Sequence, residues 1–220
     1  MRIGIYYVIG SADSAENEAQ RRMGSLAAMV AKRTLPDGEV CHLTDNRTDA
    51  FDGVDRVIRM ERDCPMTIFR MRHHQASGEW LFIDSDVLVT QDVSDLFYEA
   101  FDIAIANRVP GDGSEHAGFA EMPHNMGVVF SRCPAFWREA EKELLKYSLQ
   151  QQEWMGDQLA VCRLIRSNTF NVKKLPGETY NFPPRTSAMP KAAIVHYKGK
   201  RKPWMVEHAN QILQQNMEAA

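Results

Sequence analysis

The segment that decides the fold runs from Glu79 to Thr90 and reads EWLFIDSDVLVT. Its first four apolar residues, Trp80 to Ile83, lead directly into Asp84, and Asp86 follows two positions later. Short apolar runs of this kind are typical of strands that are buried on both faces of a parallel sheet. An unpaired buried carboxylate is costly, so a buried strand that ends in two aspartates needs a physical reason.

Strands and helices alternate along the chain, regularly in the first half and less so in the second. The pattern predicts strands over 2–9, 39–43, 54–60, 80–83, 102–106, 126–131, 170–174 and 193–197, and helices over 15–35, 65–77, 134–151, 157–166 and from 203 onward. Such alternation predicts an α/β fold whose early half is a parallel sheet. Ligands of these sheets bind beyond the carboxyl ends of the strands, where Tyr7, Asp45 and Asp84 fall.

The composition is that of a globular protein. The 220 residues are 44% hydrophobic and 25% charged, with a net charge of −3 that does not support a broad nucleic-acid-binding surface. The four cysteines lie far apart with no CxxC pair, which indicates reduced thiols rather than a zinc site. The apolar N-terminal run is too short to cross a membrane, and acidic residues follow it, unlike in a signal peptide. We therefore expect a soluble, cytoplasmic protein.

A divalent metal would explain the two aspartates. Most Asp-x-Asp tripeptides lie in loops, where they only cap a turn or a helix. Here apolar residues on both sides hold Asp84 and Asp86 in a fixed place near the core, where like charges repel each other unless a cation lies between them. Mg²⁺ and Mn²⁺ take oxygen ligands and commonly also bind substrate phosphates. The segment therefore predicts a metal that faces a diphosphate.

Two later segments supply polar residues next to predicted elements. HNMGVVFS, over 124–131, places Asn125 and Gly127 at the start of a strand, where a glycine marks either a turn or the close approach of a ligand. WMGDQLAV, over 154–161, places Asp157 at the expected N-cap of a helix. Asp157 is therefore either a helix cap or a functional carboxylate, and the sequence leaves both interpretations open.

The segment VHYKGKRKPW, over 195–204, is the most specific of the motifs. His196 ends an apolar strand, a place where most histidines are satisfied surface or core residues. Gly199 and Lys202 follow it, and a glycine backbone with a lysine can hold diphosphate charge. Imidazole added to two carboxylates favours Mn²⁺ over Mg²⁺.

Taken together, these motifs resemble glycosyltransferase family eight, the metal-dependent family of glycogenin and the bacterial lipopolysaccharide galactosyl- and glucosyltransferases. The last segment fits the family pattern of His, two residues, Gly, two residues and Lys-Pro-Trp, and the motifs keep the family order from Met1 to Trp204. The resemblance implies a GT-A nucleotide-diphospho-sugar transferase fold, a Rossmann-like mixed sheet flanked by helices. We expect one such domain over 1–220, with a helical tail from about 203.

The resemblance also implies a role for each motif residue. Asp84, Asp86 and His196 bind the metal, which is Mn²⁺ or alternatively Mg²⁺, and Asp157 and Gln158 hold the transferred sugar as the catalytic residues. The implied donor-binding residues are Arg70, Asp84, Ser85, Asn125, Gly127, Gly199 and Lys202. Arg72 is an equal alternative to Arg70. Tyr7 is added to the donor-binding residues because it lies at the end of the first predicted strand. The family usually carries Asp or Asn directly after the first strand, where this chain offers only Asp13.

The implied reaction moves a hexose from a nucleotide-diphosphate sugar, by resemblance a UDP-sugar, with retention of anomeric configuration. The acceptor stays open between a glycan, a lipid-linked sugar, a protein and a nucleobase, and the nucleophile between Asp157 and a front-face reaction stabilised by Gln158. The glycine-containing loop from Val109 to Pro123 could close over the donor. One alternative is a catalytically silent nucleotide-sugar-binding protein. The other alternative is a haloacid-dehalogenase-type phosphohydrolase, which needs a second Asp late in the sequence, and this chain has none a few residues after Asp157.

Overall fold

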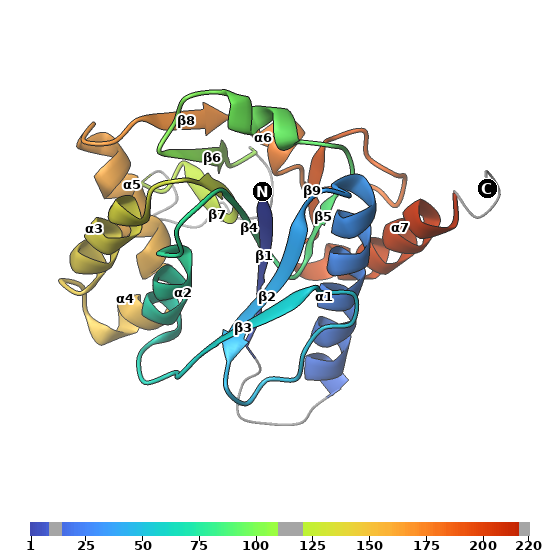
Figure 1. Ribbon diagram of the computed structural model, residues 1–220, viewed down its shortest axis with the longest axis horizontal. Coiled ribbons are helices and arrows are strands. Elements are labelled where there is room, and N and C mark those ends of the chain that lie inside the picture. Colours follow the sequence, from blue (N-terminus) through green and yellow to red (C-terminus); the bar gives the residue numbers. More distant parts are fainter. Residues whose placement is uncertain (9–14, 110–120, 216–220) are drawn as a thin grey trace.

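The computed structural model describes residues 1–8, 15–109 and 121–215 of the chain. Its centre is a seven-stranded sheet in the order β3-β2-β1-β4-β7-β6-β8, and β5 and β9 form a separate two-stranded sheet (Figure 1). The strands are β1 (Arg2–Tyr6), β2 (Glu39–Asp45), β3 (Arg56–Met60), β4 (Trp80–Asp84), β5 (Val87–Val89), β6 (Ile103–Asn107), β7 (His124–Ser131), β8 (Val172–Leu175) and β9 (Ile194–His196).

The early half of the large sheet is parallel, as the sequence predicts. β1 pairs in parallel with β2 and with β4, and β2 pairs in parallel with β3, whereas β7 runs antiparallel to both β4 and β6. In the β1–β4 register Tyr6 lies opposite Asp84. The carboxyl ends of β1, β2 and β4 therefore meet at one edge of the sheet, and Asp84 stands at that edge.

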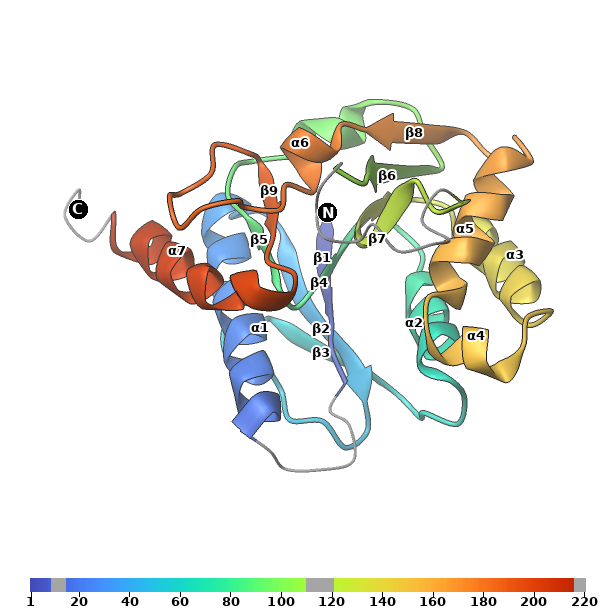
Figure 2. The same cartoon turned by 180° about the vertical axis from the view of Figure 1, so that it is seen from behind.

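Helices cover both faces of the sheet (Figures 1 and 2). On one side α1 packs against α7 and against the small β5–β9 sheet, and on the other side α2, α3, α4 and α5 pack together. The helices are α1 (Ala15–Thr34), α2 (Met66–His74), α3 (Pro134–Leu144), α4 (Leu149–Glu153), α5 (Gly156–Arg166), α6 (Gly177–Tyr180) and α7 (Lys202–Gln214), with 3-10 turns η1 (Ser94–Tyr98) and η3 (Gly199–Arg201). Throughout the described ranges, none of these helices has the length and apolar character that a membrane crossing requires.

The expected helix over 134–151 is wrong, because the structure has two helices there. The chain leaves α3 after Leu144, and Ser148 then starts α4 with a capping box in which its hydroxyl accepts from the backbone N–H of Gln151. The helix expected to reach residue 77 also ends earlier, at His74. The strand β5 and the short helix α6 have no counterpart among the expected elements, and both turn out to build the site.

Candidate functional site

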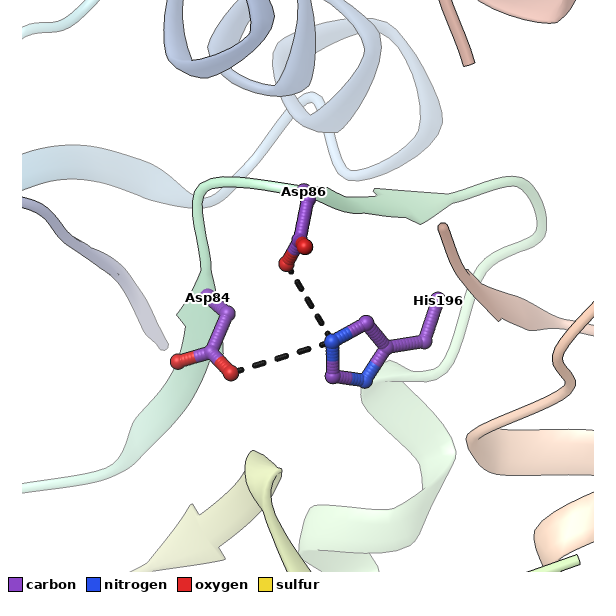
Figure 3. A group of neighbouring side chains, drawn as sticks. All are labelled: Asp84, Asp86 and His196. Atoms are coloured by element: carbon purple, nitrogen blue, oxygen red, sulfur yellow. Dashed lines mark ion pairs between the residues drawn. The ribbon is translucent and has the colours of Figure 1, made fainter. Parts of the chain in front are cut away.

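Three predicted metal ligands meet at the edge of the sheet (Figure 3). Asp84 ends β4, Asp86 precedes β5, and His196 ends β9, where the antiparallel β5–β9 pairing sets it opposite Val87. The His196 Nε2 atom lies 3.2 Å from Asp86 Oδ1 and 3.8 Å from Asp84 Oδ2. One ligand atom from each residue falls within 4.8 Å of the others. The small second sheet therefore brings together side chains that are more than a hundred positions apart in sequence.

Gly127 leaves the space that such a cluster needs. It lies inside β7, the neighbour of β4, and not in a turn. A Cβ atom at this position would sit 2.3 Å from His196 Cε1 and 2.7 Å from Asp84 Oδ2, closer than real Cβ contacts come. The glycine is thus explained by close approach to the ligand side chains and not by turn geometry.

The charge and the donor set fit a divalent metal. Two carboxylates and one imidazole form a donor set that suits Mn²⁺, with Mg²⁺ as a weaker match. Burial would by itself raise the pKa of the Asp86 carboxyl, but the neighbouring His196 and Lys202 hold that pKa below its ordinary value. Asp86 therefore stays ionised, which is the state that a metal ligand needs.

Arg70 links the Asp84–Asp86–His196 cluster to a buried carboxylate, that of Asp157. Its Nη2 atom donates to Asp84 Oδ1 at 2.6 Å and to the backbone carbonyl of Met126, and its Nη1 atom lies 3.7 Å from Asp157 Oδ2. The guanidinium also stacks over the Tyr6 ring, 5.5 Å from its centroid. Arg72 instead pairs with Glu141 and Asp63 outside the site. Of the two candidate arginines, the structure therefore brings Arg70 to the cluster.

Asp157 and Gln158 lie in the first turn of α5. The expected N-cap role of Asp157 is wrong, because the cap position belongs to Met155, a non-glycine residue with φ 62°. Asp157 is 5% exposed and accepts from the Gln158 backbone N–H at 2.8 Å. Burial raises the pKa of its carboxyl, while the Arg70 guanidinium acts to lower it. Gln158 Oε1 accepts from Arg108 Nη2 at 2.7 Å, which fixes the amide beside Asp157.

A cavity of about 360 Å³ opens next to the cluster. Five of the predicted site residues line it, namely Arg70, Asp84, Asn125, Asp157 and Gln158. The lining residues that were not predicted from sequence include Tyr6, Arg108, Trp154 and Lys198. Lys198 belongs to the basic run after His196, which is a visible sequence signal, whereas the other three are brought to the cavity by the packing of distant elements.

Other predicted site residues lie apart from the cavity wall. Tyr7 stacks on Phe51, with ring centroids 5.4 Å apart, and its hydroxyl donates to the Asn17 carbonyl, so its neighbour Tyr6 takes the place at the cavity. Ser85 is buried between the two aspartates. Gly199 adopts φ 58° in η3, and Lys202 begins α7. Asp13 and most of the loop from Val109 to Pro123 lie outside the described residues.

Asn181 is a site residue that the sequence analysis did not single out. It follows α6, is 1% exposed, and its Oδ1 atom lies 2.9 Å from His196 Nδ1. An asparagine before Phe-Pro-Pro is typical of a turn, so the local sequence carries no sign of this contact. Only the folded chain places Asn181 against the imidazole of His196.

No family model matches the chain, and no curated protein matches it. Solved structures do. The galactosyltransferase LgtC, in complex with donor and acceptor sugar analogs, matches at 14% identity and TM-score 0.57, over 96% of both chains. The glycosyltransferase GlyE of Streptococcus pneumoniae TIGR4 matches at 17% identity and TM-score 0.59, over 99% of this chain and 63% of GlyE. The bifunctional glycosyltransferase WbbM matches at 13% identity and TM-score 0.59, over 98% of this chain and 51% of WbbM. The chain therefore has the GT-A-like α/β fold of these glycosyltransferases, which is the fold that the sequence resemblance implies.

Proposed function

We propose that the chain is a metal-dependent glycosyltransferase that moves a hexose from a nucleotide-diphosphate sugar, with UDP as the diphosphate, and retains the anomeric configuration. The observation that carries this proposal is the cluster of Asp84, Asp86 and His196 beside a cavity that Arg70 and Asp157 also line, on a glycosyltransferase fold. Mn²⁺, or alternatively Mg²⁺, bound by the three cluster residues would stabilise the charge that develops on the leaving diphosphate.

Basic residues after His196 supply further charge for the diphosphate. Lys198 lines the cavity, and the charge of Lys202 helps to lower the pKa of Asp86. Between them in sequence, Gly199 exposes its backbone in a left-handed conformation. We assign the diphosphate to this side of the site. A positioned cation of this kind commonly contributes on the order of 3 kcal/mol to the stabilisation of the transition state.

We assign the sugar to the part of the cavity that Asp157 and Gln158 line. Arg70 and the first turn of α5 fix the Asp157 carboxylate, and Arg108 fixes the Gln158 amide. Both groups are thus held rigid, as residues that orient sugar hydroxyls must be. A volume of about 360 Å³ is in the range of ligand pockets. We leave the nucleophile open between Asp157 and a front-face reaction stabilised by Gln158.

We place the acceptor beside Trp154. This side chain lines the cavity while 73% of its surface stays exposed, and Glu153 lines the cavity next to it. An exposed indole next to polar groups suits an acceptor that offers both an apolar face and hydroxyl or amide groups. The acceptor stays open between a glycan, a lipid-linked sugar, a protein and a nucleobase.

The thiols favour a reducing compartment. Cys41, Cys64, Cys133 and Cys162 are free, and Cys41 and Cys162 are buried. Burial raises the pKa of the Cys41 thiol to about 11, so it stays protonated and unreactive. We therefore propose the cytoplasm as the compartment and residues 1–220 as one GT-A-like domain.

The direct test is slow hydrolysis of the donor. The protein is incubated with a panel of nucleotide sugars in Mn²⁺, in Mg²⁺ and in EDTA, and the release of nucleoside diphosphate is followed. We expect release from one donor, abolished by EDTA and reduced by about a hundredfold in Asp86→Asn, because that variant weakens the hold on the metal. Arg72→Gln, which changes a residue outside the site, serves as the control.

Two other outcomes discriminate the alternatives. Metal-dependent binding of UDP without any turnover would favour the catalytically silent nucleotide-sugar-binding protein. Release of phosphate from a simple phosphomonoester would favour the phosphohydrolase, although its nucleophilic Asp normally follows the first strand and Asp84 ends β4. The proposed function is wrong if the protein neither binds UDP nor hydrolyses any donor.

A further inference from the structure

We propose that Asn181 is a positioning residue that keeps a hydrogen on His196 Nδ1, so that Nε2, the atom that faces Asp84 and Asp86, is the ring nitrogen left to bind a metal. The backbone carbonyl of Asn107 in turn sets the orientation of the Asn181 amide. The inference rests on the proposed function in one respect, since it concerns the same metal site. A chain of hydrogen bonds, from Asn107 through Asn181 to His196, determines which nitrogen of the imidazole keeps its hydrogen.

The first step is the orientation of the Asn181 amide. Its Nδ2 atom lies 3.4 Å from the Asn107 carbonyl oxygen, and its Oδ1 atom lies 2.9 Å from His196 Nδ1. A carbonyl oxygen only accepts hydrogen bonds, so the amide must turn its NH₂ group toward Asn107. The other end, an oxygen that also only accepts, is then left to face the imidazole.

The second step is the tautomer of the ring. Because Asn181 Oδ1 can only accept, His196 Nδ1 must carry a hydrogen. In the neutral ring the lone pair is then on Nε2, the atom 3.2 Å from Asp86 Oδ1 and 3.8 Å from Asp84 Oδ2. The opposite tautomer could donate from Nε2 to Asp86, but it would leave a lone pair on Nδ1 facing the oxygen of Asn181. Metal binding needs the lone pair on Nε2. Without a metal the two carboxylates favour a hydrogen on that atom, which the metal displaces, while Asn181 keeps the other hydrogen on Nδ1.

The third step is what holds Asn181 in place. Gly177, the first residue of α6, lies so close to β6 that a Cβ atom there would sit 2.4 Å from the Asn107 carbonyl oxygen. On the other side of Asn181, Phe182 donates its backbone N–H to Ile194 and accepts from the backbone N–H of His196 at 2.9 Å. The amide is thus fixed between the end of β6 and the end of β9, and it has little freedom to flip.

The neighbourhood offers a matched control. The Asn107 side chain makes its own contact, with Oδ1 2.9 Å from His124 Nδ1, whereas the bond to Asn181 uses the Asn107 backbone carbonyl. Asn107→Ala therefore removes a polar side chain next to Asn181 and keeps the carbonyl that orients it. This variant separates loss of local packing from loss of the tautomer-fixing bond.

The test measures metal binding and the tautomer, both without donor. Calorimetry with Mn²⁺ should show affinity lowered by about tenfold to a hundredfold in Asn181→Leu, the usual effect of losing such a partner. Asn181→Asp keeps an accepting oxygen for Nδ1 but loses the NH₂ group that Asn107 orients, so it should keep more affinity than Asn181→Leu. Asn107→Ala should bind Mn²⁺ as the unchanged protein does. In ¹⁵N-histidine spectra at neutral pH, Nδ1 of His196 should carry a hydrogen in the unchanged protein and should lose it, at least in part, in Asn181→Leu.

Three results would overturn the inference. The first is an Asn181→Leu variant with full Mn²⁺ affinity. The second is an Asn181→Asp or Asn107→Ala variant that loses as much affinity as Asn181→Leu. The third is an unchanged protein in which Nδ1 of His196 carries no hydrogen. If Asn181→Leu does not fold, as judged by thermal unfolding, Asn181→Asp and the spectrum of the unchanged protein still decide. If the unchanged protein binds no Mn²⁺, the proposed function fails, whereas the spectrum tests the tautomer independently.

Discussion

Single residues of α2 show how the fold selects among chemically equal side chains. Arg70 and Arg72 have the same chemistry and lie two positions apart, which on a helix points them in nearly opposite directions. Arg70 faces the half-buried Asp84 and the buried Asp157, whereas Arg72 faces Glu141 at the other side of the helix. Because the sequence does not say how α2 is rotated, only the packed helix decides which arginine belongs to the site.

This difference gives a matched pair of substitutions. Arg70→Gln should lower the free energy of unfolding by about 3 kcal/mol, because it leaves the buried Asp157 and the half-buried Asp84 without their common cation. Arg72→Gln removes a partly exposed pair and should cost less than about 1 kcal/mol. Urea unfolding at neutral pH measures both. Equal losses in the two variants would contradict the buried network around Arg70.

At the scale of elements, the approach to α5 is the least regular part of the site. The capping-box pattern Ser148 to Gln151 starts α4, and the chain then reaches α5 through Met155 in a left-handed conformation. Gly156 follows, where a Cβ atom would sit 2.3 Å from the Gln151 carbonyl oxygen. This close packing of α5 on α4 sets the position of Asp157.

Gly156→Ala tests that packing. The new methyl group meets backbone, which cannot easily move, so we expect a loss of about 1–3 kcal/mol in the free energy of unfolding and a displaced Asp157. Ser148→Ala is the control, because it loosens the start of α4 at a cost of about 1 kcal/mol without crowding α5. Donor hydrolysis should fall by at least about tenfold in Gly156→Ala and stay unchanged in Ser148→Ala. Equal activity in both would show that α4 does not position Asp157.

At the scale of the whole molecule, buried histidines should make stability depend on pH. Burial lowers the pKa values of His42, His73 and His124 to about 4. Near His42, a hydrogen bond to the Tyr7 backbone carbonyl opposes that shift and the charge of Arg59 adds to it. In the unfolded chain these rings protonate near pH 6.5, so below that pH the unfolded state binds more protons than the folded state. Stability is therefore full above about pH 6.5 and falls as the pH drops toward about 4.

The size of the effect can be measured for one ring. A shift from 6.5 to about 4 corresponds to about 3 kcal/mol for His42 over the full window. Urea unfolding at about pH 7.5 and about pH 5 should show a marked loss of stability at the lower pH. In His42→Gln the free energy of unfolding should fall less between the two pH values, since one titrating ring is gone. The expectation for His42 is wrong if its removal leaves the pH dependence unchanged.

The sequence by itself determined the alternation of strands and helices, the parallel early half of the sheet and the motifs that carry Asp84, Asp86 and His196, because local apolar periodicity and strand-end polar residues are local properties of the chain. It did not determine the break between α3 and α4, the strand β5 or the short helix α6, since short elements depend on what packs against them. Tertiary structure alone decided that β5 and β9 pair and so bring His196 to the aspartates, that Arg70 rather than Arg72 faces them, and that Asn181 stands behind the imidazole. Each of these is a contact between segments far apart in the chain, whose geometry is fixed only when the sheets and helices pack against one another.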